Sequence, residues 1–267
     1  WWSENVRLAA RGGGIGSYWG NLRSIGEKIG KVGKTSGIIP FIKVMDSLTM
    51  AISQGSLRRG SAACYLPIDH PEIEEFIENA TTQLTGLDIL VNNAAAPGGL
   101  ARGPLSGIKD EDVINDLDTK VMGYLRCARA VAPYMIAQNW GRIINIGGTS
   151  ARRANGNLSA GVRNAGLVNF TKYLAEDLGR SGITANIVHP GTTRTERSAP
   201  MYEEEARKAG STVAEVEARV ASGNSTKRIV DASELAYVVA FLASPRSIAL
   251  SGEVISASGG AGLAVFH

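Results

Sequence analysis

Hydrophobic residues recur along most of the chain at helical or strand spacing. Residues 157–179 carry four large apolar side chains at three- and four-residue steps: Leu167, Phe170, Leu174 and Leu178. This spacing predicts a helix with one apolar face, which ends at Gly179. Similar patterns predict further helices over residues 69–84, 110–135 and 232–244.

Short apolar stretches separate these helices and predict strands. They lie within residues 86–99, 140–148, 182–193 and 251–260. Strands that alternate with helices of roughly ten or more residues form parallel crossover units. The pattern therefore predicts an α/β fold: a doubly wound parallel sheet with helices on both faces, in three layers.

Composition narrows the class of protein. A chain of 267 residues with 44% hydrophobic and 20% charged residues is long enough for one large core, so we expect a single domain over residues 1–267. A formal charge of +3, with dispersed basic residues, argues against nucleic acid as a partner. No apolar run reaches the about 18 residues of a membrane span, and the start lacks a signal-peptide layout. Cys64 and Cys127 suggest neither a disulfide framework nor a metal site, so we expect a cytoplasmic protein without metal.

Four local patterns occur in a fixed order over the last 200 or so residues. They are "LDILVNNAA" at 87–95, "GRIINI" at 141–146, "VHPGTTRT" at 188–195 and "SGEVISASGG" at 251–260. In these segments the chain resembles the short-chain dehydrogenase/reductase superfamily. The resemblance implies a Rossmann-type fold, NADP or NAD as cofactor, and oxidoreductase activity on a carbonyl or alcohol substrate.

The resemblance and the strand ends together suggest where a cofactor binds. A ligand of an open α/β sheet lies beyond the carboxyl ends of the strands, where Asn92 and Ala94 emerge. Pro190 and Gly191 form the turn that meets the nicotinamide in the family. Thr195 stands where the family hydrogen-bonds the nicotinamide carboxamide, and the four-pattern context favours this role over the alternative of a plain turn threonine.

The first part of the chain fits the family less closely. "AARGGGIG" at 9–16 places Gly14, Ile15 and Gly16 at the end of a glycine-rich loop, whose backbone N–H groups would face a pyrophosphate. Asp69 resembles the acid that contacts the adenine amine, but a helix N-cap explains it as well. Residues 34–36 either face the 2′-phosphate of NADP or form a solvated loop.

The family's catalytic side chains are absent at the aligned positions. Ala160 stands at the tyrosine position, Asn164 at the lysine, Gly148 at the serine and Lys120 at the asparagine. We expect an atypical oxidoreductase whose proton transfer passes to Thr149, Ser150 or another group. The further candidates are Ser159, Tyr202, His189 or a water. The alternative is a protein of the same fold without hydride transfer: a lyase, an isomerase or a nucleotide-binding regulatory subunit.

Lys120 and Asn164 suggest a specific hypothesis. The lysine and the amide appear exchanged between two neighbouring predicted helices, so the Lys120 ammonium is expected to reach toward the Asn164 amide or a shared water. Partial burial would lower the pKa of such a lysine. The alternative is that Lys120 extends to the surface and Asn164 caps a backbone group.

Substrate and assembly are the last expectations. Arg152 and Arg153, with Arg163 nearby, suit an anionic or carrier-linked carbonyl compound, although solvated surface arginines are the plain alternative. Tyr202 lies in residues 196–228, which resemble the family's substrate lid.

A homodimer or homotetramer is expected through helices 111–137 and 161–178. The apolar side chains for such an interface are Val121, Leu125, Val131 and Met135.

Overall fold

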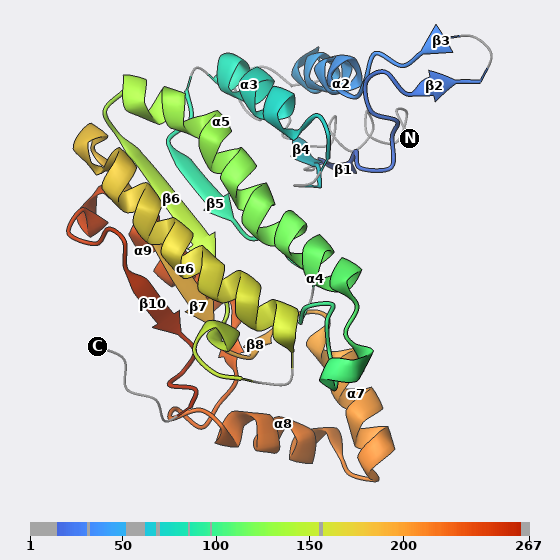
Figure 1. Ribbon diagram of the computed structural model, residues 1–267, viewed down its shortest axis with the longest axis vertical. Helices are drawn as coiled ribbons and strands as arrows, with labels where there is room; N and C mark the ends of the chain where they lie inside the picture. The colour runs from blue at the N-terminus through green and yellow to red at the C-terminus, as the bar shows by residue number, and fades with distance from the viewer. Residues whose placement is uncertain are drawn as a thin grey trace. The chain divides into compact units, whose positions relative to one another are not determined.

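The computed structural model describes residues 15–30, 33–51, 62–67, 70–84, 86–96, 98–154 and 157–262 (Figure 1). The chain forms two compact units, Trp1–Gly86 and Leu87–His267. Gly14 and Asp69, two of the expected cofactor residues, lie outside the described residues.

In its described residues, the first unit combines short strands with two helices. Strand β1 (Ile15–Tyr18) pairs in parallel with β4 (Ala62–Tyr65), and β2 (Lys28–Ile29) pairs antiparallel with β3 (Gly33–Lys34). The helices are α2 (Ile39–Ala51) and α3 (Ile73–Leu84). Four buried apolar residues form the core of this unit: Trp19, Ile38, Ile39 and Met45.

The prediction of a glycine-rich loop at Ile15 and Gly16 is wrong. Both residues lie in strand β1, where Ile15 is opposite Ala62 and Gly16 is opposite Ala63. Their backbone belongs to a parallel strand pair, so it does not form a loop that opens a helix.

The second unit contains a four-stranded parallel sheet in the order β10-β7-β6-β5. The strands are β5 (Ile89–Asn92), β6 (Gly141–Ile146), β7 (Ile183–Pro190) and β10 (Val254–Ala257). Every residue of β6 and nearly every residue of β7 is buried, as expected for central strands covered on both faces.

Alternate residues of β6 contact helices on opposite faces of this sheet. Ile144 packs with Leu242 of α9 (Ala232–Ala243), whereas the Asn145 amide donates to Thr171 of α6 (Leu158–Leu178) at 3.0 Å. Figure 1 shows α6 and α5 (Gly123–Ala137) in front of the sheet and α9 behind it. The expected three-layer α/β/α arrangement is confirmed.

The helix predicted over residues 110–135 is interrupted. Helix α4 (Asp110–Leu117) continues into a π-helical turn, Asp118–Met122, before α5 begins at Gly123. Single π turns inside α-helices often mark functional sites, since they change the direction of the side chains they carry. Lys120 lies within this turn.

Residues 196–228 form a helical segment with its own small core. Helices α7 (Ser198–Ala209) and α8 (Val213–Ser222) lie between β8 (Thr193–Arg194) and β9 (Val230–Asp231), which pair in parallel. The apolar core of the segment consists of Tyr202, Ala206, Val216 and Ile229.

Helix α6 is 21 residues long, and its N-terminus is capped by Asn157, whose side-chain oxygen accepts from the Ala160 N–H at 2.9 Å. Across the described residues, no helix is both long enough and apolar enough to cross a membrane.

Candidate functional site

A cavity of about 350 Å³ lies beyond the carboxyl ends of β5, β6 and β7. The strand ends supply backbone and small side chains, and the π turn and α6 supply polar ones. Its lining includes Asn93, Ala95, Ala96 and Gly98 after β5, residues 147–150 after β6, and Pro190 and Gly191 at the end of β7. Lys120, Ala160, Arg163 and Asn164 complete the wall.

Lys120 is buried in this wall. Its side chain comes from the π turn, the residue is 3% exposed, and Nζ donates to the Gly147 carbonyl at 3.1 Å. Burial, as the largest cause, and the positive charge of Arg163 lower the pKa of Lys120, the negative charge of Asp116 raises it, and the result is a pKa of about 7. The alternative that Lys120 extends to the surface is therefore wrong.

Asn164 contacts a different partner in the same wall. Its Nδ2 donates to Ser150 Oγ at 2.8 Å, and Ser150 Oγ donates to the Ala160 carbonyl at 3.0 Å. The Asn164 Oδ1 atom is buried and has no hydrogen-bond partner among the described residues. A buried acceptor without a partner, on a residue that lines a cavity, is suited to a ligand that donates a hydrogen bond.

Gly148, which stands at the position of the family's serine, lies against the Asn164 side chain. A Cβ atom at Gly148 would lie 2.8 Å from Asn164 Nδ2, so any side chain there would displace the amide. Ser150, two residues further on, supplies the hydroxyl that contacts Asn164 instead.

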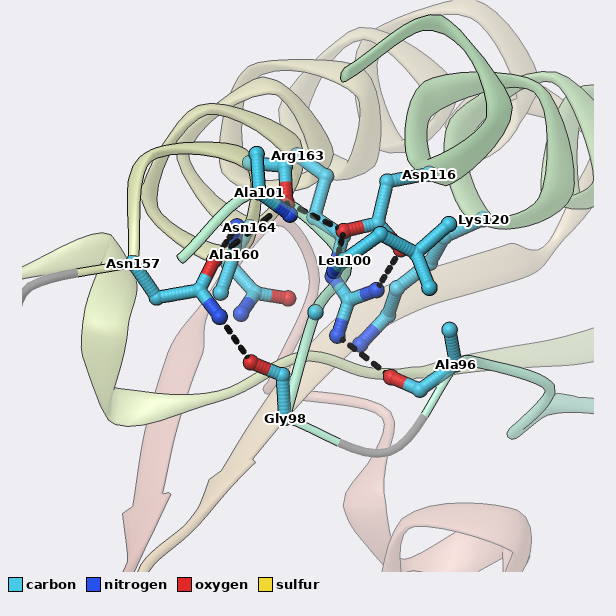
Figure 2. Close-up of polar contacts among 12 residues, drawn as sticks. Ala96, Gly98, Leu100, Ala101, Asp116, Lys120, Asn157, Ala160, Arg163 and Asn164 are labelled. Carbon is cyan, nitrogen blue, oxygen red and sulfur yellow. Dashed lines mark hydrogen bonds and ion pairs between the residues drawn. The ribbon is translucent and has the colours of Figure 1, made fainter. Parts of the chain in front are cut away.

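Asp116 and Arg163 form a buried ion pair next to these residues (Figure 2). Arg163 also donates to the Ala96 carbonyl at 3.0 Å, and Asp116 accepts from the Leu100 N–H at 2.9 Å and from Ser159 Oγ. Sequence reasoning missed Asp116. It lies one helical turn before Lys120, but it is one of five acidic residues between positions 110 and 118, so the sequence does not single it out.

His189 is an acceptor in this structure. The residue is 1% exposed, and its Nδ1 accepts from the Gly148 N–H at 2.9 Å, so the proton of the neutral ring is on Nε2. Burial, as the largest cause, and the positive charges of Arg152 and Lys120 together lower the pKa of His189 to about 4. A proton-donor role at neutral pH is therefore wrong for His189, because the ring remains neutral.

The expected cofactor residues separate into two groups. Pro190 and Gly191 line the cavity, whereas Asn92 donates to Asn145 Oδ1 at 2.9 Å and links β5 to β6. The Ala94 carbonyl accepts from the Tyr124 hydroxyl at 3.1 Å. Thr195 is exposed, and its N–H donates to Ser198 Oγ at 3.0 Å at the start of α7, which is the turn arrangement weighed as its alternative.

The expected catalytic and substrate residues also separate. Thr149 and Ser150 line the cavity, but Arg152, Arg153 and Tyr202 are not part of its wall. Arg152 is half-buried and Arg153 exposed, on the loop that follows Ser150. A direct substrate contact by Tyr202 is not supported, because this side chain is buried in the core of residues 196–228.

Comparison with known proteins agrees with this geometry. The family described as Enoyl-(Acyl carrier protein) reductase matches residues 20–262. The chain belongs to the short-chain dehydrogenase/reductase superfamily. It is similar to this superfamily's 3-oxoacyl-[acyl-carrier-protein] reductase FabG of Vibrio cholerae, with 33% identity over 73% of the chain and 75% of the relative. The corresponding Escherichia coli protein is 31% identical over 93% of the chain and 97% of the relative.

Solved structures of other proteins share the fold. YwfH, an NADPH-dependent reductase involved in bacilysin biosynthesis, aligns with a TM-score of 0.70 and 24% identity, over 99% of this chain and 95% of that one. L-Sorbose reductase from Gluconobacter frateurii, complexed with NADPH and L-sorbose, aligns with a TM-score of 0.71 and 22% identity, over 97% and 92% of the two chains. The predicted superfamily and fold class are confirmed, and the expectation of an NAD(P)-dependent enzyme is confirmed at the level of the family.

Proposed function

We propose that this protein is an NADP- or NAD-dependent oxidoreductase that interconverts a carbonyl compound and an alcohol. Membership of the superfamily supports the proposal, as do relatives named as reductases along most of the chain. The observation that carries it is the position of the cavity: it lies beyond the carboxyl ends of three adjacent parallel strands, and Lys120 is buried in its wall.

The residues of the cavity fit the nicotinamide end of such a cofactor. Asn164 Oδ1 is a buried acceptor without a described partner, suited to a ribose hydroxyl or an amide N–H. Pro190 and Gly191 add a narrow turn, and Gly191 admits no side chain, because its Cβ would lie 2.9 Å from the Ser258 Cβ. When bound, the nicotinamide supplies or accepts the hydride. Gly14 and Asp69 stay predicted cofactor residues, as do Asn92, Ala94 and Thr195.

In the proposed reaction Lys120 moves the proton. A pKa of about 7 lets Lys120 exist in both forms near neutral pH, which suits a general acid in reduction and a general base in oxidation. The Gly147 carbonyl holds the ammonium in the wall, and Ala160 leaves the space of the family's tyrosine free. Thr149 and Ser150 present hydroxyls that can donate to the substrate oxygen, so they assist in orienting it.

An anionic or carrier-linked carbonyl compound is the proposed substrate class. Two relatives are 3-oxoacyl-[acyl-carrier-protein] reductases, and Arg152 and Arg153 follow the cavity residues Thr149 and Ser150 on one loop. Residues 196–228 are the proposed lid over the substrate. Replacing both arginines with Ala should raise KM for a charged oxoacyl substrate and leave a small neutral ketone unaffected. Equal effects on the two substrates would argue against charge recognition.

Titration with NADPH and NADH tests the cofactor directly. Binding to the folded state should raise the melting temperature with nucleotide concentration and enhance nucleotide fluorescence. The variant Lys120→Met should still bind the nucleotide, while turnover falls by about 10²–10⁴-fold. Absence of any thermal or fluorescence change at millimolar concentrations of both nucleotides would contradict the proposal.

One specific observation favours the alternative function, which is nucleotide binding without hydride transfer. Ala160 and Asn164 occupy the positions of the family's tyrosine and lysine. Under this alternative the nucleotide binds, but no carbonyl or alcohol in a broad panel changes its redox state.

We also propose that the protein assembles through α5 and α6. Val131 and Met135 are buried within the chain, so the expectation that they serve an interface is wrong. The exposed apolar side chains on and beside these helices are Met122, Ile136, Leu158, Val162 and Tyr173, and Val121 and Leu125 are half-buried. Sedimentation at micromolar concentration should show a dimer or tetramer, and a monomer alone would contradict this.

A further inference from the structure

Three charged side chains are buried together in one wall of the cavity region. Asp116 is 0% exposed, Lys120 3% and Arg163 4%. They come from α4, the π turn and α6. Buried charges are costly unless they are paired and hydrogen-bonded, so such a cluster needs a structural or functional reason.

The ion pair holds a loop of the cavity wall. The Arg163 guanidinium donates to the Ala96 carbonyl at 3.0 Å, and the Asp116 carboxylate accepts from the Leu100 N–H at 2.9 Å. Ser159 connects the two helices to the same loop, because its hydroxyl bonds Asp116 and accepts from the Ala101 N–H at 3.0 Å. Figure 2 shows these contacts around the Arg163 guanidinium, with Lys120 and Asn164 beside it.

We propose that Asp116 and Arg163 are positioning residues, whose ion pair fixes the backbone at Ala96 and Leu100 to α4 and α6 and sets the charge around the Lys120 ammonium. The contacts that hold the loop do not depend on any reaction. The effect of the ion pair on turnover rests on the proposed function, because it requires that Lys120 moves the proton.

The two members of the pair act on Lys120 in opposite directions. The Arg163 charge lowers the pKa of Lys120, and the Asp116 charge raises it. Of the other titratable groups near this wall, Arg152 acts on His189 through its positive charge, whereas His189 and Tyr124 are themselves uncharged at neutral pH. His189 on β7 has its pKa lowered to about 4, and burial raises the pKa of Tyr124 on α5 well above its ordinary value. The charge state of Lys120 is therefore governed by its burial and by this pair.

Single substitutions separate the two charges. Asp116→Asn should lower the pKa of Lys120 and Arg163→Gln should raise it, each by about one pH unit. The measurement is an NMR titration of the ¹³Cε signals of labelled lysine, with Lys120 assigned by its loss in Lys120→Met. Amide exchange at Leu100 should accelerate at least about tenfold in Asp116→Asn, because the acceptor of its hydrogen bond is no longer charged.

Matched controls come from the Asp118–Arg126 pair. It joins Arg126 Nη2 to Asp118 Oδ1 at 2.7 Å, and the side chains of Arg126 and Asp118 are 30% and 46% exposed. Asp118 is two residues from Lys120 in the chain. Asp118→Asn and Arg126→Gln remove the same charges where solvent screens them, so the pKa of Lys120 should move little.

If either single variant fails to fold, the double variant Asp116→Leu/Arg163→Met removes both charges and keeps an apolar volume. Its Leu100 amide should exchange as fast as in Asp116→Asn, and its turnover should follow a pH profile different from the wild type. Shifts of the Lys120 pKa in the same direction for both single variants, or no larger than in the controls, would overturn the proposal. So would unchanged protection of Leu100 in the double variant. The NMR titration of Lys120 and the amide exchange of Leu100 need neither nucleotide nor substrate. A failure to bind NADPH would therefore count against the proposed function alone.

Discussion

Helix α6 buries apolar side chains from Leu167 to its C-terminus and polar ones before Leu167. In the C-terminal part, counted from Leu167, the buried residues include Leu167, Leu174 and Leu178, and in the N-terminal part Ser159, Arg163 and Asn164 are buried to the same degree. The leucines hold the helix in the core by removing apolar surface from water. The polar side chains are instead held by specific partners on α4 and on the loops after β5 and β6. One helix thus anchors the fold at one end and builds the cavity wall at the other.

The largest expected difference between the polar and apolar parts of the site region is in how the ionisation of Lys120 makes the stability depend on pH. The folded pKa of Lys120, about 7, lies below its ordinary 10.5, so the unfolded chain binds more protons between these values. Stability therefore rises with pH across this window, and the cost of burying the charged lysine is fully present below pH 7. Between pH 7 and 10 the wild type should gain about 4 kcal/mol relative to Lys120→Met in urea unfolding.

A surface lysine supplies the control for this measurement. Lys172 on α6 is exposed and pairs with Glu176 at 2.7 Å. Lys172→Met should show no comparable gain of the wild type over this window. An equal pH dependence for both variants would mean that Lys120 titrates as a surface group.

The apolar half should respond in stability alone. Leu167→Ala removes a fully buried side chain and leaves a cavity, so the free energy of unfolding should fall by about 3 kcal/mol. Nucleotide affinity, measured where the variant is still folded, should stay within about twofold. A large loss of affinity without loss of stability would break the division between the two halves.

The polar half should respond in binding with little effect on stability. Asn164→Leu keeps the approximate size of the side chain and removes a buried acceptor that has no described partner. The lost bond to Ser150 offsets this gain, so the stability should change by less than about 1 kcal/mol. Affinity for NADPH should fall at least about tenfold, as measured by fluorescence titration.

Much of the second unit is predictable from its pattern of apolar residues. The helix ending near Gly179 and the strands "GRIINI" and "GITANIVHP" are present where the spacing places them, because burial on a sheet requires that spacing. The family motifs placed Lys120, Ser150, Pro190 and Asn164 near the strand ends, and all four line one cavity.

Other features have no local signature. The π turn that carries Lys120 lies in a stretch that reads as one continuous helix, since one inserted residue per turn hardly changes an amphipathic pattern. The Asp116–Arg163 pair joins residues 47 positions apart, and only the fold brings them together. The glycines at the start suggested a loop, yet Ile15 and Gly16 pair with β4, because strand pairing overrides a short motif.

The most direct test of the account is the pH profile of turnover in the wild type and in Lys120→Met. With NADPH and a 3-oxoacyl substrate, the wild-type rate of reduction should be high below pH 7 and should fall above it, because the ammonium form donates the proton. Lys120→Met should be slower by about 10²–10⁴-fold, with no inflection near pH 7. A variant profile with the same inflection and a similar rate would show that another group moves the proton, which would contradict the central claim.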